Sequence, residues 1–188
     1  MSSHRALVLG GTGMLSGVSG WLAGQGWHVV VPSRRYCPIP VDDDADDAAD
    51  AAGASRGRVR WVEARWERPE RLAQDAARAL GGPADLLVSW VHSTYRVPVL
   101  NEVAGLLTED APVVEVHGRS VPSRELEPAL SGHPTQRVVL GYVREGTSTR
   151  WLTHAEIVDG VLVAVRRALT DRPRTEHHVG ETAPRPVH

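Results

Sequence analysis

The sequence predicts an α/β protein built on a doubly wound parallel sheet of about six strands, in one domain. Two observations predict this fold. Short, unbroken apolar runs alternate with segments whose apolar residues recur at helical spacing, as expected when helices bury both faces of a parallel sheet. In addition, a glycine cluster at residues 10–13 directly follows the first apolar run, where a strand would turn into a helix.

The first half of the chain supplies four strands and two helices. After the glycine cluster, Leu15, Val18 and Leu22 recur at helical spacing until glycines end the helix near residue 24. In order, the predicted elements are strand 6–9, this first helix, strand 27–31, strand 59–62, helix 69–80 and strand 85–91. Parallel strands joined through a helix in this way close with a right-handed crossover.

The second half continues the same alternation. The predicted elements are helix 97–107, strand 113–116, strand 138–143 and a last helix. Thr153 and Glu156 have the spacing of a capping box at the start of this last helix. Apolar residues from Ile157 to Val165 then form the stripe that would face the sheet.

The domain is predicted to occupy residues 1–170, and two segments fall outside its regular elements. Six aspartates crowd into the stretch near 40–57, which is expected to be a flexible, solvated insert because like charges repel. Residues 171–188 are rich in Pro, Arg and His and are expected to form a tail. Its adjacent His177 and His178 are expected to be exposed, since no third ligand stands at metal-binding spacing. No metal site is predicted.

Length and composition restrict the function classes. The 188 residues suffice for one domain with a buried core, and this domain is expected to bind both cofactor and substrate. A formal charge of −2 argues against a nucleic-acid partner. A single cysteine, Cys37, allows no internal disulfide, and the N-terminal residues lack a long apolar run. We therefore expect a cytoplasmic protein that binds a small-molecule substrate and no membrane.

The glycine cluster lies between a predicted strand and a predicted helix, which is the context of a dinucleotide site. Glycines let the backbone approach a pyrophosphate, whose charge the N–H groups at the helix start then stabilise. The residues expected to bind the cofactor here are Gly10, Thr12, Gly13, Met14 and Leu15. The alternative is a tight turn with no ligand.

The end of the second strand bears on the choice of cofactor. Ser33 stands twenty positions after Gly13, where an NAD-binding protein would place an acid for the ribose hydroxyl. No acid is present there, and the following Arg34 and Arg35 offer guanidinium groups that suit a 2′-phosphate. The sequence therefore predicts that Ser33, Arg34 and Arg35 bind NADP(H). The alternative is a solvated pair of arginines.

The motif Gly-Gly-Thr-Gly-Met-Leu at residues 10–15, with arginine after the second strand, resembles the small atypical members of the short-chain dehydrogenase/reductase superfamily. The likeness spans most of the chain. It implies a Rossmann-type fold, a nicotinamide cofactor with a preference for NADP(H), and pairing of two chains into a homodimer.

Three departures from the family pattern bear on function. Ser16 stands where a third glycine is expected, with Gly17 one position late. Arg65 and Trp66 stand where an acid usually contacts adenine, so adenine is expected to be stacked instead. Orthodox members use a Tyr and a Lys four residues later, but residues 118–136 contain no Tyr and the 21 basic residues are all Arg. The resemblance therefore does not extend to the standard carbonyl-reductase mechanism.

Polar residues just past the predicted strands are the remaining candidates for chemistry, because ligands of parallel sheets bind at the carboxyl ends of the strands. His92 and Tyr95 follow the fourth strand, and His117 follows the fifth. Each could donate the proton that a carbonyl needs after hydride transfer. A further set after the sixth strand, Tyr142, Arg144 and Glu145, is expected to face the same site.

The leading hypothesis is an NADPH-dependent reductase of a small organic substrate, either a carbonyl or an imine or iminium. An iminium is already positively charged, so its reduction needs no strong acid and tolerates the missing Tyr–Lys pair. Two alternatives stay open on the same fold. One is a non-redox cyclase or isomerase that uses histidine as acid or base. The other is a catalytically silent nucleotide-sensing module.

Overall fold

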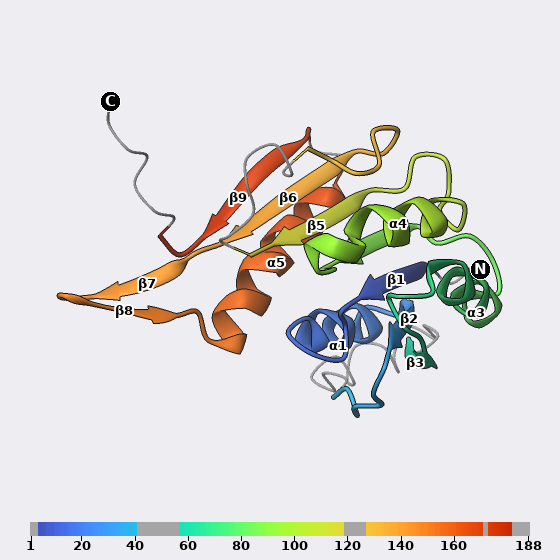
Figure 1. Cartoon of the computed structure of the whole chain (residues 1–188), viewed down its shortest axis with the longest axis horizontal. Helices are drawn as coiled ribbons and strands as arrows, with labels where there is room; N and C mark the ends of the chain where they lie inside the picture. The colour runs from blue at the N-terminus through green and yellow to red at the C-terminus, as the bar shows by residue number, and fades with distance from the viewer. Residues whose placement is uncertain (1–3, 41–56, 119–126, 171–172, 182–188) are drawn as a thin grey trace, which may run out of the picture.

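The computed structural model describes residues 4–40, 57–118, 127–170 and 173–181. Within these residues, one parallel sheet of seven strands runs in the order β3-β2-β1-β4-β5-β6-β9 (Figure 1). Its strands are β1 Arg5–Leu9, β2 His28–Ser33, β3 Arg58–Glu63, β4 Leu86–Ser89, β5 Val113–His117, β6 Thr135–Leu140 and β9 Thr175–Val179. The helices are α1 Ser16–Gly24, α3 Pro69–Leu80, α4 Ser93–Ala104 and α5 His154–Ala168. The predicted doubly wound parallel sheet is confirmed.

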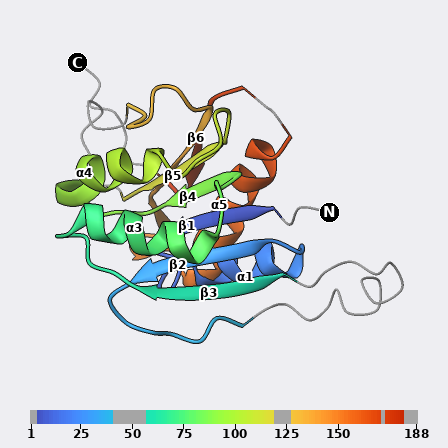
Figure 2. The same ribbon diagram turned by 90° about the vertical axis from the view of Figure 1, so that its right-hand side faces the viewer.

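The helices cover both faces of the sheet, with α1 and α5 on one side and α3 and α4 on the other (Figure 2). Alternate residues of β1 show the division, since successive side chains of a strand point to opposite faces. Ala6 and Val8 belong to the core beneath α1 and α5, whereas Leu7 and Leu9 belong to the core beneath α3 and α4. All four side chains are fully buried, which explains why β1 reads as an unbroken apolar run.

The sheet gains a strand in a segment that we expected to be a tail. Residues of β9 pair in parallel with β6, and Thr175, His177 and Val179 are half-buried while the residues between them are exposed. The exposed state expected for His177 is therefore wrong. Its Nε2 atom lies 2.9 Å from Oε1 of Gln136, and burial, with a smaller effect of Arg167, lowers the pKa of His177.

The predicted sixth strand is divided in two. Strand β6 ends at Leu140, and the chain then enters an antiparallel hairpin of β7 Tyr142–Glu145 and β8 Ser148–Trp151 that extends away from the sheet (Figure 1). Gly146 makes the tight turn of the hairpin with a φ of +61°.

Side chains cap the first turns of both α4 and α5. The capping box of α5 is confirmed, because Thr153 Oγ1 accepts the N–H of Glu156 and Glu156 Oε2 accepts the N–H of Thr153. Helix α4 begins at Ser93, four residues earlier than predicted. The side chain of His92 caps it by accepting the N–H of Thr94, and Pro98 lies inside the helix rather than near its start.

The acidic insert predicted near 40–57 falls almost wholly on residues 41–56, which lie outside the described residues, as do the last residues of the predicted tail. In the part of the chain that the structure describes, no helix is long and apolar enough to span a membrane.

Candidate functional site

The glycine turn joins β1 to α1 at the carboxyl edge of the sheet, and its glycines have different roles. Gly10 has a φ of +86°, and a Cβ on Gly11 would lie 2.7 Å from Oγ of Ser19. These two glycines are needed to build the turn itself. A Cβ on Gly13, in contrast, would have one atom within 4 Å, the Gly10 carbonyl oxygen at 3.9 Å. The positive φ of the turn thus belongs to Gly10, and Gly13 faces open space.

The start of α1 presents unsatisfied backbone donors beside this open space. Leu15 is the N-cap residue and provides no side-chain hydrogen bond to the helix. Ser16 donates its N–H to the Gly13 carbonyl, while the N–H groups of Gly17 and Val18 have no partner among the described residues. Free N–H groups at a helix start attract anions. The Leu15 side chain is fully buried in the core, so only its backbone could contact a ligand.

The first residue of α5 lies next to the first residue of α1. Nε2 of His154 is 3.4 Å from Oγ of Ser16, and a Cβ on Gly17 would lie 2.9 Å from Val158 of α5. The glycine that stands one position late therefore lets α1 approach α5. His154 is a candidate ligand-contacting residue that the sequence analysis missed, since it is 138 positions away from Ser16 in the chain.

The loop after β2 carries the predicted 2′-phosphate residues. Ser33 Oγ donates to the Arg35 carbonyl oxygen at 2.7 Å and accepts a hydrogen bond from Nε1 of Trp61 at 2.9 Å. Arg34 and Arg35 are exposed, and their guanidinium groups have no partner among the described residues. The ring of Tyr36 meets that of Trp61 edge-on, with centroids 5.6 Å apart. This loop thus holds two free guanidinium groups beside an aromatic pair.

The two tryptophans near the end of β3 have different surroundings. Trp66 packs against the core beneath α3 and α4, so its ring contributes to that core. Trp61 of β3 is the aromatic residue that borders the Ser33 loop instead. Sequence reasoning missed Trp61 because this residue stands within the β3 strand pattern rather than after it.

The first turn of α4 carries His92 and Tyr95, whose ring centroids are 6.5 Å apart. Nδ1 of His92 accepts the N–H of Thr94 at 3.3 Å, so the proton of the neutral ring resides on Nε2. His92 is exposed and Tyr95 is half-buried. The His92 ring can therefore offer an N–H donor outward from the cap of α4.

Beneath this turn lies a buried ionic cluster formed by Arg96, Glu115 and His117. Nη2 of Arg96 is 2.6 Å from Oε2 of Glu115, and the Ala129 N–H donates to Oε1 at 2.9 Å. Nε2 of His117 lies 3.5 Å from the same carboxylate, without the geometry of a hydrogen bond. The side chains of Glu115 and His117 are only 1% and 4% exposed.

The charge state of Glu115 follows from its neighbours. Burial acts to raise the pKa of its carboxyl group, but His117, Arg96 and the Ala129 N–H together lower the pKa below its ordinary value. The carboxylate is therefore ionised at neutral pH and compensates the charge of Arg96.

The structure brings together some of the predicted catalytic residues. His92 and Tyr95 share the first turn of α4 with Arg96, and Arg96 connects this turn to the end of β5 at His117 through Glu115. Arg96 and Glu115 were missed by the sequence analysis. The available signal was a lone acid between Val114 and Val116 in a buried strand, where a charge requires a partner.

The residues expected after the sixth strand are engaged elsewhere. Tyr142 is buried at the base of the hairpin. Arg144 pairs with Glu181, and Glu145 pairs with Arg150 across the hairpin. Because β7 directly follows β6, which pairs in parallel with β5, the grouping of this set with the strand-end histidines stays a prediction.

Comparison with known proteins supports the fold. No family model and no curated protein match the chain. Among solved structures, YwfH, described as an NADPH-dependent reductase involved in bacilysin biosynthesis, aligns over 97% of this chain and 100% of its own at 10% identity, with a TM-score of 0.62. The chain has a short-chain dehydrogenase/reductase-like fold. A 3-oxoacyl-[acyl-carrier protein] reductase from Brucella melitensis, solved with NAD, aligns over 96% of both chains at 14% identity, with a TM-score of 0.60. A short-chain dehydrogenase/reductase from Serratia marcescens aligns over 96% and 98% at 15% identity, with a TM-score of 0.57.

In this short-chain dehydrogenase/reductase-like fold the strands of the main sheet are all parallel, so their carboxyl ends share one edge. Four predicted site segments lie along that edge. The glycine turn follows β1, Ser33 ends β2, His92 comes shortly after β4, and His117 ends β5. The strand order reverses between β1 and β4, which is the position where open α/β sheets bind ligands.

Proposed function

We propose that the protein is an NADPH-dependent reductase of a small organic substrate. The observation that carries the proposal is the open space over Gly13 beside the free N–H groups of α1, at the point where the strand order reverses. The similarity of the fold to that of YwfH, described as an NADPH-dependent reductase, supports it.

The residues present fit a dinucleotide phosphate. The N–H groups of Gly17 and Val18 would bind the pyrophosphate, with His154 beside them. Arg34 or Arg35 would bind the 2′-phosphate, since a guanidinium group matches phosphate with two parallel N–H donors. Bound NADPH would supply a hydride to the substrate.

At the substrate end, we favour an imine or iminium over a carbonyl. No Lys exists in the chain, and the guanidinium of Arg96 is held by the Glu115 carboxylate and the Glu127 carbonyl oxygen. Its charge is thus already compensated, and it is not free to activate Tyr95. An iminium accepts hydride to give a neutral amine without further proton transfer, whereas a carbonyl would need a proton from His92, Tyr95 or His117.

The proposal is tested by the oxidation of NADPH, followed at its near-ultraviolet absorbance, with a panel of cyclic imines and ketones. Turnover with NADPH consumption supports the reductase. Turnover of the substrate without consumption of NADPH would instead indicate the cyclase or isomerase. Selective stabilisation by NADPH in a thermal-shift panel of NADPH, NADH and FAD, with no turnover of any substrate, would favour the sensing module.

Replacing both Arg34 and Arg35 with alanine is expected to weaken NADPH binding by about ten- to hundredfold and to leave NADH binding nearly unchanged. A charge-assisted contact to phosphate contributes on the order of 1.5–3 kcal/mol, which corresponds to that factor. Calorimetric titration with both nucleotides measures it. Arg166→Ala is the matched control, because Arg166 is an exposed arginine of α5 that lies over the ring of Trp21 in α1. Equal affinities for NADPH and NADH in the unmodified protein would contradict the assignment.

Gly13→Val is expected to abolish nucleotide binding while the protein stays folded. The Val side chain enters space that is open in the structure, so it displaces the pyrophosphate and not the protein. Circular dichroism checks the fold and titration checks binding. Gly105→Val is the control, since a Cβ added at Gly105, the C-cap residue of α4, would meet nothing within 4 Å and would lie away from the glycine turn. Unaltered affinity in a folded Gly13→Val protein would place the nucleotide elsewhere.

A further inference from the structure

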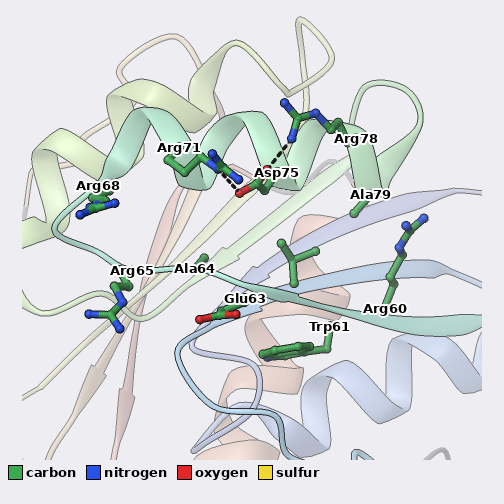
Figure 3. Close-up of a pocket in the computed structure, with 11 residues that line it drawn as sticks. Arg60, Trp61, Glu63, Ala64, Arg65, Arg68, Arg71, Asp75, Arg78 and Ala79 are labelled. Carbon is green, nitrogen blue, oxygen red and sulfur yellow. Dashed lines mark hydrogen bonds and ion pairs between the residues drawn. The ribbon is translucent and has the colours of Figure 1, made fainter.

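A groove of about 610 Å³ runs between the outermost strand β3 and helix α3, and no residue of the glycine turn lines it (Figure 3). Its lining is rich in arginine. The residues that line it are Arg60, Trp61, Val62, Glu63, Ala64, Arg65, Arg68, Arg71, Asp75, Arg78 and Ala79. Five guanidinium groups therefore face two carboxylates, and the groove carries a surplus of positive charge.

The arginines of α3 form a row along one wall. Arg71 and Arg78 flank Asp75, whose carboxylate accepts from Nε of Arg71 at 2.6 Å and from Nη1 of Arg78 at 2.7 Å (Figure 3). The Asp75 side chain is 18% exposed, whereas the two arginines are 68% and 69% exposed. Asp75 thus orients two guanidinium groups that keep further N–H donors for a ligand.

The other three arginines of the groove differ from Arg71 and Arg78 in that no acidic side chain among the described residues pairs with them. The guanidinium groups of Arg60, Arg65 and Arg68 form no hydrogen bond or ion pair within the part of the chain that the structure describes. Three unpaired cations at one groove repel each other, so an anionic ligand would relieve this repulsion.

The floor of the groove is an open sheet edge. Among the described residues, strand β3 pairs with β2 alone in the sheet, and its Arg58 and Ala64 N–H groups donate to backbone oxygens on the β2 side. Backbone groups of a strand alternate between its two edges, so the N–H and C=O groups of Val59, Trp61 and Glu63 face away from β2. These backbone groups could form hydrogen bonds with a further strand placed beside β3.

We propose that this groove binds an extended acidic peptide segment of a partner protein, which adds to β3 as a further strand. Arg68, the N-cap residue of α3, and Arg78 are ten positions apart, which corresponds to roughly 15 Å along the helix. About five residues of strand cover that length, and every second side chain points to the same face. Carboxylates at alternate positions would therefore meet the arginines, while the peptide backbone pairs with the β3 edge. The proposal does not depend on the reductase activity.

The backbone edge distinguishes this ligand from other polyanions. A polyphosphate or an oligonucleotide would satisfy the guanidinium groups but not the N–H and C=O groups of Val59, Trp61 and Glu63. Arginines beside an open edge can also serve only to prevent aggregation through that edge. The test must therefore separate strand addition from charge alone.

The test uses the full chain and a fluorescein-labelled peptide of alternating glutamate and valine, with binding measured by fluorescence anisotropy. A second peptide of the same sequence carries N-methyl groups on alternate amides, which keeps its charge but blocks the ladder. We expect the first peptide to bind and the N-methylated one to bind at least about tenfold more weakly, since several backbone hydrogen bonds are lost. Equal binding of both peptides, displacement by tripolyphosphate alone at equal charge concentration, or no binding of either peptide would overturn the proposal.

Variants locate the site. The double variant R71Q/R78Q is expected to weaken the first peptide by at least about tenfold, because charge-assisted contacts are lost. R60Q/R68Q is the second variant, and it removes no hydrogen bond or ion pair that the described residues make. Arg166→Gln on α5, on the opposite face of the sheet, is the control and should bind as the unmodified protein does. Unchanged binding in both double variants would overturn the assignment to this groove.

Discussion

With a carbonyl substrate, one of His92→Ala, Tyr95→Phe or His117→Ala should lower turnover by about a hundredfold to ten-thousandfold and leave NADPH affinity intact. Hydride transfer to a carbonyl leaves an alkoxide, and a positioned proton donor contributes a factor of this order. In the absence of lysine, these three side chains are the titratable candidates at the ends of β4 and β5. Initial rates of NADPH oxidation, with the nucleotide affinity titrated separately, measure the effect.

The three variants have different physical consequences, which helps to separate catalysis from damage to the fold. His92 is exposed, and its replacement removes only the cap of α4, which is worth about 1 kcal/mol. His117 is buried beside Glu115, so His117→Ala needs a check of stability before its rate is interpreted. His178→Ala is the matched control, because His178 is an exposed histidine of β9 paired with Glu176. A carbonyl turnover that all three variants leave unchanged would remove these residues from the mechanism.

An iminium substrate leads to a different outcome for the same variants. The substrate arrives protonated, so the replacements should act mainly on its binding, and the rate should follow the ionisation of the imine substrate as pH changes. A pH–rate profile on two imines of different basicity measures this. If the profile stays fixed while the basicity of the substrate changes, a protein group provides the proton after all.

The elements around the glycine turn could be predicted because local sequence determines them. The apolar run of β1, the glycines that follow and the capping box of Thr153 and Glu156 each act within a few residues, and the structure has all of them. Strand β9 could not be predicted in this way. Its residues are mostly polar, and what stabilises it is pairing with β6 and the contact of His177 with Gln136, both distant in sequence.

In the candidate site, too, features that local sequence determines could be predicted, and features that depend on distant contacts could not. The strand-end positions of His92 and His117 follow from the alternation of elements along the chain. The ionic cluster below them does not, because Arg96 and Glu115 lie on a helix and a strand and meet only in the folded sheet. His154 and Trp61 were missed for the same reason, since each contacts its partner across two separate elements.

Glu115→Gln is expected to cost about 3–5 kcal/mol in the free energy of unfolding. The side chain of Arg96 is 11% exposed, and the substitution leaves its guanidinium group buried without a counter-charge. Urea unfolding at neutral pH measures the loss. Glu145→Gln is the control, because Glu145 also pairs with an arginine but is 58% exposed, so the loss of this surface pair should destabilise the protein far less than the loss of the buried one.

The pH dependence of stability provides the second readout of the same pair. The folded protein lowers the pKa of Glu115, so its stabilising effect is fully present above the unfolded value near 4.5 and is lost as pH falls through the lower, folded pKa. The unmodified protein should therefore lose more stability than Glu115→Gln between neutral pH and pH values below 4.5. The double variant Arg96→Met with Glu115→Gln should recover part of the loss at neutral pH, because no buried charge then remains unpaired. Equal acid slopes in the unmodified protein and Glu115→Gln, together with no recovery in the double variant, would show that this buried pair does not contribute to the stability of the fold.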